Sequence, residues 1–131
     1  MDKQPLVYIV DDEESIRDSL KMLLQTLNYK TICFESAQEF LDKCELTRPA
    51  CLLVDVCMPK ISGLQLLNIL LAKKINMPVI LMTGFGDQTT QSQALRDGAL
   101  GFIEKPFSKE NLLRILQQCA DFHNKTKISQ W

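Results

Sequence analysis

Short apolar segments rich in β-branched residues alternate along this chain with longer segments whose apolar residues recur at helical spacing. The alternation occurs five times within 131 residues. Parallel neighbouring strands need a long crossover connection, which is usually a helix, whereas antiparallel strands can be joined by a short turn. Regular alternation of strands and helices therefore favours parallel strands. Near-continuous apolarity indicates that most of these strands are covered on both faces. The pattern therefore predicts an α/β fold with a doubly wound, five-stranded parallel sheet and right-handed crossovers.

The strands are expected at residues 6–10, 30–34, 51–54, 79–83 and 100–103. The first helix is expected from an apolar stripe at helical spacing, formed by Ile16, Leu20, Leu23, Leu24 and Leu27. Ser36 and Glu39 form a capping box that predicts a short second helix. A third helix is expected at residues 63–74, and Ser108 caps a last helix that ends at about Phe122.

The fourth helix, expected at residues 89–96, has little apolar surface with which to pack. It begins with five polar residues, and only Ala94 and Leu95 offer apolar anchorage. We therefore predict a loosely held helix, and hence local mobility.

Size, charge and hydropathy limit the class of protein. A chain of 131 residues, 46% of them hydrophobic, can bury one hydrophobic core of common size. We therefore expect one domain over residues 1–123 and a polar tail over residues 124–131. A net charge of −1 gives no global positive field for nucleic acid or anionic lipid, so no direct DNA partner is expected. No signal peptide is visible, and no apolar run approaches the ~20 residues of a membrane span. A soluble protein that makes no membrane contact is expected.

The five cysteines also bear on location and metal binding. Their odd number and the lack of a CxxC pair indicate a reducing compartment, which fits a cytoplasmic protein. We expect them to act as small buried hydrophobic residues rather than as metal ligands.

Polar residues follow the expected strands, where parallel α/β sheets bind their ligands. Asp11 and Asp12 follow the first strand, and Asp55 follows the third. Thr83 ends the fourth strand, and Lys105 comes after the fifth. Because the carboxyl ends of parallel strands lie at one edge of the sheet, we expect these five side chains to meet.

A cluster of carboxylates at this edge has a defined chemistry. Like charges repel unless a cation joins them, and an oxygen-only ligand set suits Mg²⁺ rather than zinc. A carboxylate held near Mg²⁺, a hydroxyl and a lysine can attack phosphorus in line, so we expect Asp55 to form an acyl phosphate. The Thr83 hydroxyl and the backbone N–H of Gly84 are expected to donate hydrogen bonds to the phosphoryl oxygens.

Each of these residues also has an ordinary explanation. Asp11 and Asp12 suit the start of the first helix, where its dipole favours acids. Taken alone, Thr83 is an ordinary threonine at a strand end, and Lys105 is an ordinary surface lysine. The prediction therefore depends on the whole set and on its order along the chain.

In this arrangement the chain resembles the receiver domain of two-component response regulators, from about residue 6 to residue 122. The matching elements are Asp11-Asp12, the run Asp-Val-Cys-Met-Pro-Lys-Ile-Ser-Gly at 55–63, Thr83-Gly84, and Lys105-Pro106-Phe107. The stretches at 83–87 and 102–107 are most similar to receivers of the FixJ type, which usually precede a helix-turn-helix DNA-binding domain. The resemblance implies the (βα)5 flavodoxin-like receiver fold, with strand order 2-1-3-4-5.

The resemblance also implies a role for each matched residue. Asp55 accepts a phosphoryl group from the phosphohistidine of a sensor histidine kinase. Asp11 and Asp12 hold Mg²⁺, directly or through water, together with Asp55 and the backbone carbonyl of Cys57. Lys105 neutralises charge at the same site.

A conformational switch is implied as well. When the Thr83 hydroxyl is drawn toward the phosphoryl group, the Phe102 ring turns into the vacated space and alters the surface around the fourth helix and the fifth strand. Without the resemblance, Phe102 is equally well explained as a core aromatic. Phe85 stands where receivers vary and where a side chain can screen the phosphoryl group. The peptide bond before Pro106 is expected to be cis, although only ~5% of such bonds are cis.

The implied protein is a phosphoacceptor switch and not an enzyme, since it assists only its own phosphoryl transfer and slow dephosphorylation. Its expected partners are a histidine kinase, a second copy bound on phosphorylation, and DNA through an output domain that follows the tail. A stand-alone receiver and a degenerate receiver are alternatives. A Mg²⁺-dependent aspartyl phosphohydrolase needs a second acid where Cys57 stands. A flavin-binding domain needs a neutral phosphate loop in place of Asp11 and Asp12.

Overall fold

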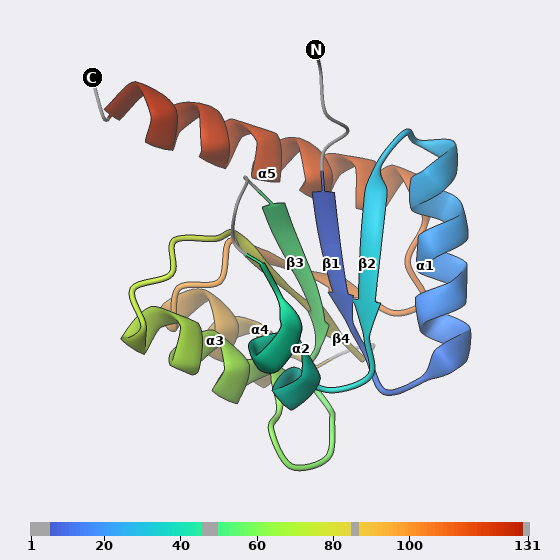
Figure 1. Cartoon of the computed structure of the whole chain (residues 1–131), viewed down its shortest axis with the longest axis horizontal. Helices are drawn as coiled ribbons and strands as arrows, with labels where there is room; N and C mark the ends of the chain where they lie inside the picture. Colours follow the sequence, from blue (N-terminus) through green and yellow to red (C-terminus); the bar gives the residue numbers. More distant parts are fainter. Residues whose placement is uncertain (1–5, 46–49, 85–86, 130–131) are drawn as a thin grey trace.

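The computed structural model describes residues 6–45, 50–84 and 87–129, with side chains as far as His123. Five parallel strands form a sheet in the order β2-β1-β3-β4-β5, which confirms the predicted architecture (Figure 1). The strands are β1 (Leu6–Val10), β2 (Lys30–Phe34), β3 (Ala50–Asp55), β4 (Val79–Thr83) and β5 (Gly101–Glu104). The helices are α1 (Glu14–Thr26), α2 (Ala37–Lys43), α3 (Gly63–Ala72), α4 (Gln88–Arg96) and α5 (Lys109–Ser129).

Two apolar layers hold the helices to the sheet. On one face, α1 and α5 cover alternate residues of the central strands, including Ile9, Leu53 and Ile80. On the other face, α2, α3 and α4 pack against the intervening residues, including Val54 and Leu81. Every residue of β1, β3 and β4 is buried, as expected for strands covered on both sides.

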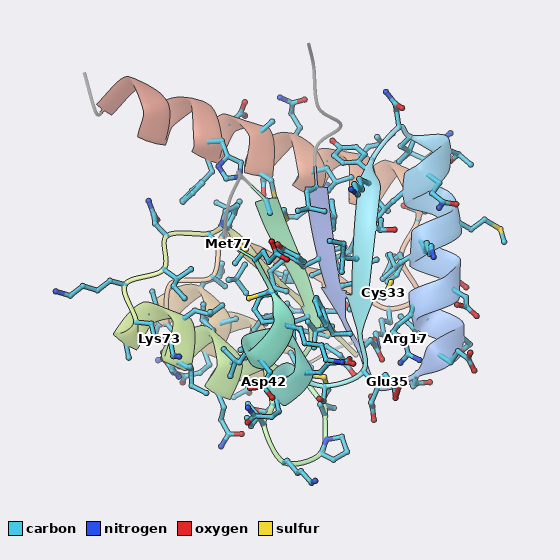
Figure 2. All side chains as sticks on the ribbon, in the orientation of Figure 1. Arg17, Cys33, Glu35, Asp42, Lys73 and Met77 are labelled. Atoms are coloured by element: carbon cyan, nitrogen blue, oxygen red, sulfur yellow. The ribbon has the colours of Figure 1, made fainter. Side chains whose placement is uncertain are left out.

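The edge strand β2 departs from that expectation. Its first four residues alternate between exposed and partly buried and only Phe34 is buried, since among the described strands β2 pairs with β1 alone. One side of β2 packs on α1, where Cys33 and Arg17 are labelled in Figure 2. Ile32 faces the other way and is 36% exposed.

The caps of the short helices follow the sequence signals. The Ser36 hydroxyl accepts a hydrogen bond from the backbone N–H of Glu39 at the start of α2, as predicted. The Glu39 carboxylate accepts from the N–H of Glu35 and not from that of Ser36, so only half of the predicted capping box is formed. A full capping box of Ser62 and Gln65 begins α3. The predicted end of α3 is wrong, because the helix stops at Ala72 and Lys74 adopts a positive φ of 59°.

Helix α5 is longer than predicted. It continues beyond Phe122 to Ser129, over part of the tail expected at residues 124–131. This stretch contains no glycine or proline, so nothing in its backbone ends the helix. The domain boundary at residue 123 stays a prediction. In the described part of the chain, no helix combines the length and apolarity needed to cross a membrane.

Helix α4 packs differently from the prediction. Ala94 is fully buried as expected, but Leu95 is 49% exposed and anchors nothing in the described core. The second buried residue is instead Gln91, which is 8% exposed. A polar side chain is therefore buried in this helix, where apolar anchorage was expected from Ala94 and Leu95 alone.

Candidate functional site

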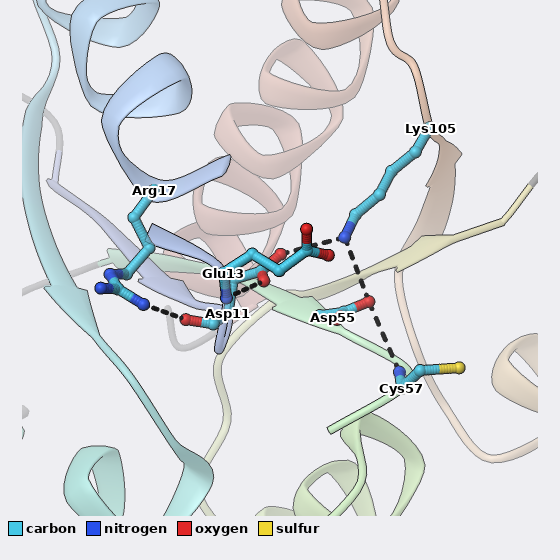
Figure 3. Close-up of polar contacts among 6 residues, drawn as sticks. All are labelled: Asp11, Glu13, Arg17, Asp55, Cys57 and Lys105. Carbon is cyan, nitrogen blue, oxygen red and sulfur yellow. Dashed lines mark hydrogen bonds and ion pairs between the residues drawn. The ribbon is translucent and has the colours of Figure 1, made fainter. Parts of the chain in front are cut away.

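The carboxyl ends of β1 and β3 and the loop after β5 bring three charged side chains together (Figure 3). The Lys105 ammonium lies 3.1 Å from Asp11 Oδ2 and 3.3 Å from Asp55 Oδ1. Asp11 is fully buried and Asp55 is 6% exposed. These contacts join residues that are far apart in the sequence, and they confirm the expected meeting of Asp11, Asp55 and Lys105.

Asp11 is fixed by contacts on all sides. Its backbone N–H donates to the carbonyl of Phe34 on the neighbouring strand, and its own carbonyl accepts from the Arg17 guanidinium at 2.7 Å. Its Oδ1 atom accepts from the backbone N–H of Glu13 at 2.9 Å. Asp11 therefore shapes the entry to α1, as its ordinary explanation requires, and also presents Oδ2 to Lys105.

Asp55 is the last residue of β3, and close backbone packing holds the loop that follows it. The N–H of Val56 donates to the carbonyl of Met82, and the N–H of Cys57 donates to Asp55 Oδ1 at 3.4 Å. Gly63 lies directly against this turn, since a Cβ atom there would stand 2.6 Å from the Asp55 carbonyl oxygen. The glycine thus allows α3 to begin directly against the backbone of Asp55.

Burial and charge both shift ionisation at this site. Burial raises the pKa of the Asp55 carboxyl, and the Asp11 carboxylate raises it further, while Lys105 partly opposes both effects. For the Lys105 ammonium, burial alone lowers the pKa, but Asp11 and Asp55 outweigh it and the net pKa is raised. The lysine therefore stays charged, whereas ionised Asp55 is held at an energetic cost.

The carboxylates also suit a cation. One oxygen each from Asp11, Asp12 and Asp55 lie within 4.8 Å of one another, and Asp12 is exposed to solvent while the other two are buried. Because all three are hard oxygen donors and solvent can complete the shell, the set fits Mg²⁺, which usually keeps several waters. This is the acidic triad typical of the receiver Mg²⁺ site.

The remaining predicted residues lie around this cluster. Thr83 is buried at the end of β4, and its cross-strand partner is Glu104, so Thr83 and Phe102 share a face of the sheet. Gly84 is exposed, with open space where a Cβ would stand. The bond between Lys105 and Pro106 is cis, as the resemblance implied. Phe85 lies outside the described residues, and the metal role of the Cys57 carbonyl stays a prediction.

Three further residues support the site and were not predicted to do so. Arg17 braces the backbone of Asp11, Gly63 makes room beside Asp55, and the Gln91 amide donates to the Thr83 hydroxyl. Gly63 ends the run at 55–63 that matches receivers, and Gln91 left a signal of another kind. It precedes the buried Ala94 by three residues, and residues at this spacing share a helix face.

Comparison with known proteins agrees with this geometry. The family model of the response regulator receiver domain matches residues 7–117. The chain is 37% identical over 115 residues to the transcriptional regulatory protein FixJ of Rhizobium meliloti, covering 88% of this chain and 56% of that protein. It is 39% identical over 107 residues to the transcriptional regulatory protein TdiR of Thauera aromatica, covering 82% of this chain and 47% of that protein. The chain thus spans about half the length of the curated relatives it matches.

Solved structures give the same result. The crystal structure of FixJ-N superposes with a TM-score of 0.85 at 36% identity, covering 92% of this chain and 96% of that one. The response regulator StyR superposes with a TM-score of 0.88 at 30% identity, covering 98% of this chain and 65% of that one. The match in fold, site residues and sequence assigns this chain to the response regulator receiver domain family, and it is similar to the receivers of FixJ-like transcriptional regulators.

Proposed function

We propose that this chain is a phosphorylation switch whose acceptor is the carboxylate of Asp55. The observation that carries the proposal is the contact of one lysine with two buried carboxylates at the ends of β1 and β3. Receiver domains are typically phosphoacceptor switches rather than enzymes, and family membership implies a cognate histidine kinase. The identity of that kinase and the location of the protein, expected to be cytoplasmic, stay predictions.

The proposed reaction exchanges one bond for another. A carboxylate oxygen of Asp55 attacks the phosphorus of a phosphohistidine, an O–P bond forms as the P–N bond breaks, and the histidine nitrogen keeps the electron pair of the broken bond. Bound Mg²⁺ neutralises phosphoryl charge in such reactions. Asp11, Asp12 and Asp55, with the Cys57 carbonyl, would hold it.

The protein's own donors have separate tasks in this reaction. Lys105 already lies 3.3 Å from Asp55 Oδ1, so its ammonium can bind a phosphoryl oxygen without a large movement. Thr83 and the backbone N–H of Gly84 donate to the other oxygens. Phe102 then follows Thr83 on the shared face of the sheet and changes the surface formed by α4, β5 and α5.

The output of the switch is proposed from the relatives. Several of them are named as transcriptional regulators, and the chain spans about half their length. We propose that phosphorylation promotes pairing of two copies of this protein through α4, β5 and α5. This pairing would control transcription through a helix-turn-helix domain.

Intact mass spectrometry tests the acceptor. Incubation with acetyl phosphate and Mg²⁺ should add one phosphoryl group to the wild-type chain, and chelation with EDTA should prevent it. Asp55→Asn should remain unlabelled, while the matched variant Asp97→Asn, at the end of α4, should be labelled normally. Equal labelling of Asp55→Asn would refute the assignment, and steady release of phosphate from a generic ester would favour a phosphohydrolase.

A further inference from the structure

Gln91 is a buried amide on α4, whose other buried residue is Ala94. Its side chain is 8% exposed, and its Nε2 atom donates a hydrogen bond to Thr83 Oγ1 at 3.3 Å. A primary amide removed from water is costly unless it is hydrogen bonded. The bond to Thr83 therefore offsets part of the cost of placing Gln91 inside the fold.

The chemistry of the two groups fixes the direction of this bond. An amide nitrogen only donates, so the Thr83 oxygen accepts and its hydroxyl hydrogen remains available to another acceptor. Threonine is stiff at χ1 and occupies separate staggered rotamers. At 3.3 Å the bond is already long, so a change of rotamer would carry the oxygen out of reach of Gln91 unless α4 followed.

We propose that Gln91 is a positioning residue that holds the Thr83 hydroxyl on the α4 side of the site, and that engagement of Thr83 by a phosphoryl group on Asp55 breaks this hydrogen bond. The inference rests on the proposed function and adds a residue to it. Gln91 opposes activation before phosphorylation, because its bond must be lost when the hydroxyl moves.

The same bond links the acceptor site to α4. The buried residues of α4 are Gln91 and Ala94, and Leu95 is half exposed. Together with the packing of Ala94, the hydrogen bond to Thr83 attaches this helix to the end of β4. Its loss loosens α4 when Thr83 moves, which is a direct physical route from Asp55 to the surface of the helix.

Beryllium trifluoride with Mg²⁺, a stable mimic of the phosphoryl group, tests the tether. Gln91→Met keeps an unbranched side chain of similar length but removes the donor. It should bind beryllium trifluoride about twofold to tenfold more tightly than wild type, which corresponds to the net free energy of one hydrogen bond. Binding is measured by ¹⁹F NMR. Gln88→Met, at an exposed position on the same helix, should match wild type.

A double-mutant cycle separates the tether from general packing. In the Thr83→Ala background the acceptor is gone, so Gln91→Met should have no further effect on affinity. An equal gain with and without the threonine hydroxyl would overturn the proposal, as would a Gln91→Met affinity equal to that of wild type. If wild-type protein itself binds no beryllium trifluoride, the proposed function fails instead.

The wild-type chain gives a second readout that does not depend on the folding of a variant. The side-chain amide resonances of Gln91 in ¹H–¹⁵N spectra should shift when beryllium trifluoride is added, while those of exposed Gln88 stay in place. Unchanged Gln91 resonances in a protein that binds the mimic would show that the bond survives, and the tether would be rejected.

Discussion

Replacing Asp55 with asparagine should stabilise the metal-free protein while abolishing its labelling. Asparagine has nearly the same shape as aspartate but no charge, so it removes the cost of burying a carboxylate beside Asp11 and Asp12. Lys105 keeps its partner, because its contact with Asp11 at 3.1 Å remains. The expected gain thus arises from repulsion and desolvation that wild-type protein tolerates for function.

Contact distances set the size of the effect. At an effective dielectric constant of about 20, each carboxylate within 4.8 Å opposes ionised Asp55 by roughly 3 kcal/mol, and Lys105 at 3.3 Å favours it by roughly 5 kcal/mol. Two carboxylates therefore offset one lysine, which leaves the desolvation of Asp55 uncompensated. Because Asp12 is exposed and screened, we expect a net gain of about 1 to 3 kcal/mol in the free energy of unfolding.

Urea unfolding in EDTA measures this gain, with Asp18→Asn on the exposed face of α1 as the control. The pKa of Asp55 is raised in the folded state, so the folded protein is favoured at acid pH and loses that advantage as pH rises through the folded pKa. The gap between Asp55→Asn and wild type should accordingly be small in acid and widen toward neutral pH. An Asp55→Asn protein that is no more stable than wild type at pH 7 would refute the reasoning.

Two further predictions follow from local packing and exposure. Gly63→Ala should lower the free energy of unfolding in urea by about 1 to 3 kcal/mol, because its Cβ would stand 2.6 Å from the Asp55 carbonyl oxygen. Gly84→Ala is the control, since a Cβ there would meet nothing within 4 Å, and it should change the same free energy by less than about 0.5 kcal/mol. Iodoacetamide should alkylate exposed Cys57 in the folded protein but spare buried Cys51. The contact with Cys119 and burial both raise the pKa of the Cys51 thiol, which lowers its reactivity further. Peptide mapping that finds Cys51 modified as fast as Cys57 would contradict this prediction.

Much of the fold could be read from local patterns. Apolar strands and helical stripes are periodic signals within a few residues, so the order of elements and four of the helices followed directly. Helix ends were less certain. The positive φ of Lys74 ends α3 earlier than expected, and α5 continues to Ser129 through a stretch that contains no glycine or proline.

The members of the site were predictable, whereas their contacts were not. That Asp11, Asp55 and Lys105 would share one edge followed from parallel strands, since every carboxyl end lies on the same side. That one ammonium would contact both carboxylates, and that Asp11 would be fully buried while Asp12 is exposed, depends on how β1, β3 and the loop after β5 are placed side by side.

Sequence by itself determined the alternating elements, the parallel sheet and the acidic edge, because these depend on periodicity and on residue types at strand ends. Tertiary structure alone decided that α4 buries Gln91 and leaves Leu95 about half exposed. The rotation of a weakly amphipathic helix about its axis is set by what lies beneath it, and here a threonine hydroxyl offers a hydrogen bond to the amide. The spacing of Gln91 and Ala94 places both on one face of α4, but the spacing alone does not decide that this polar face is the buried one.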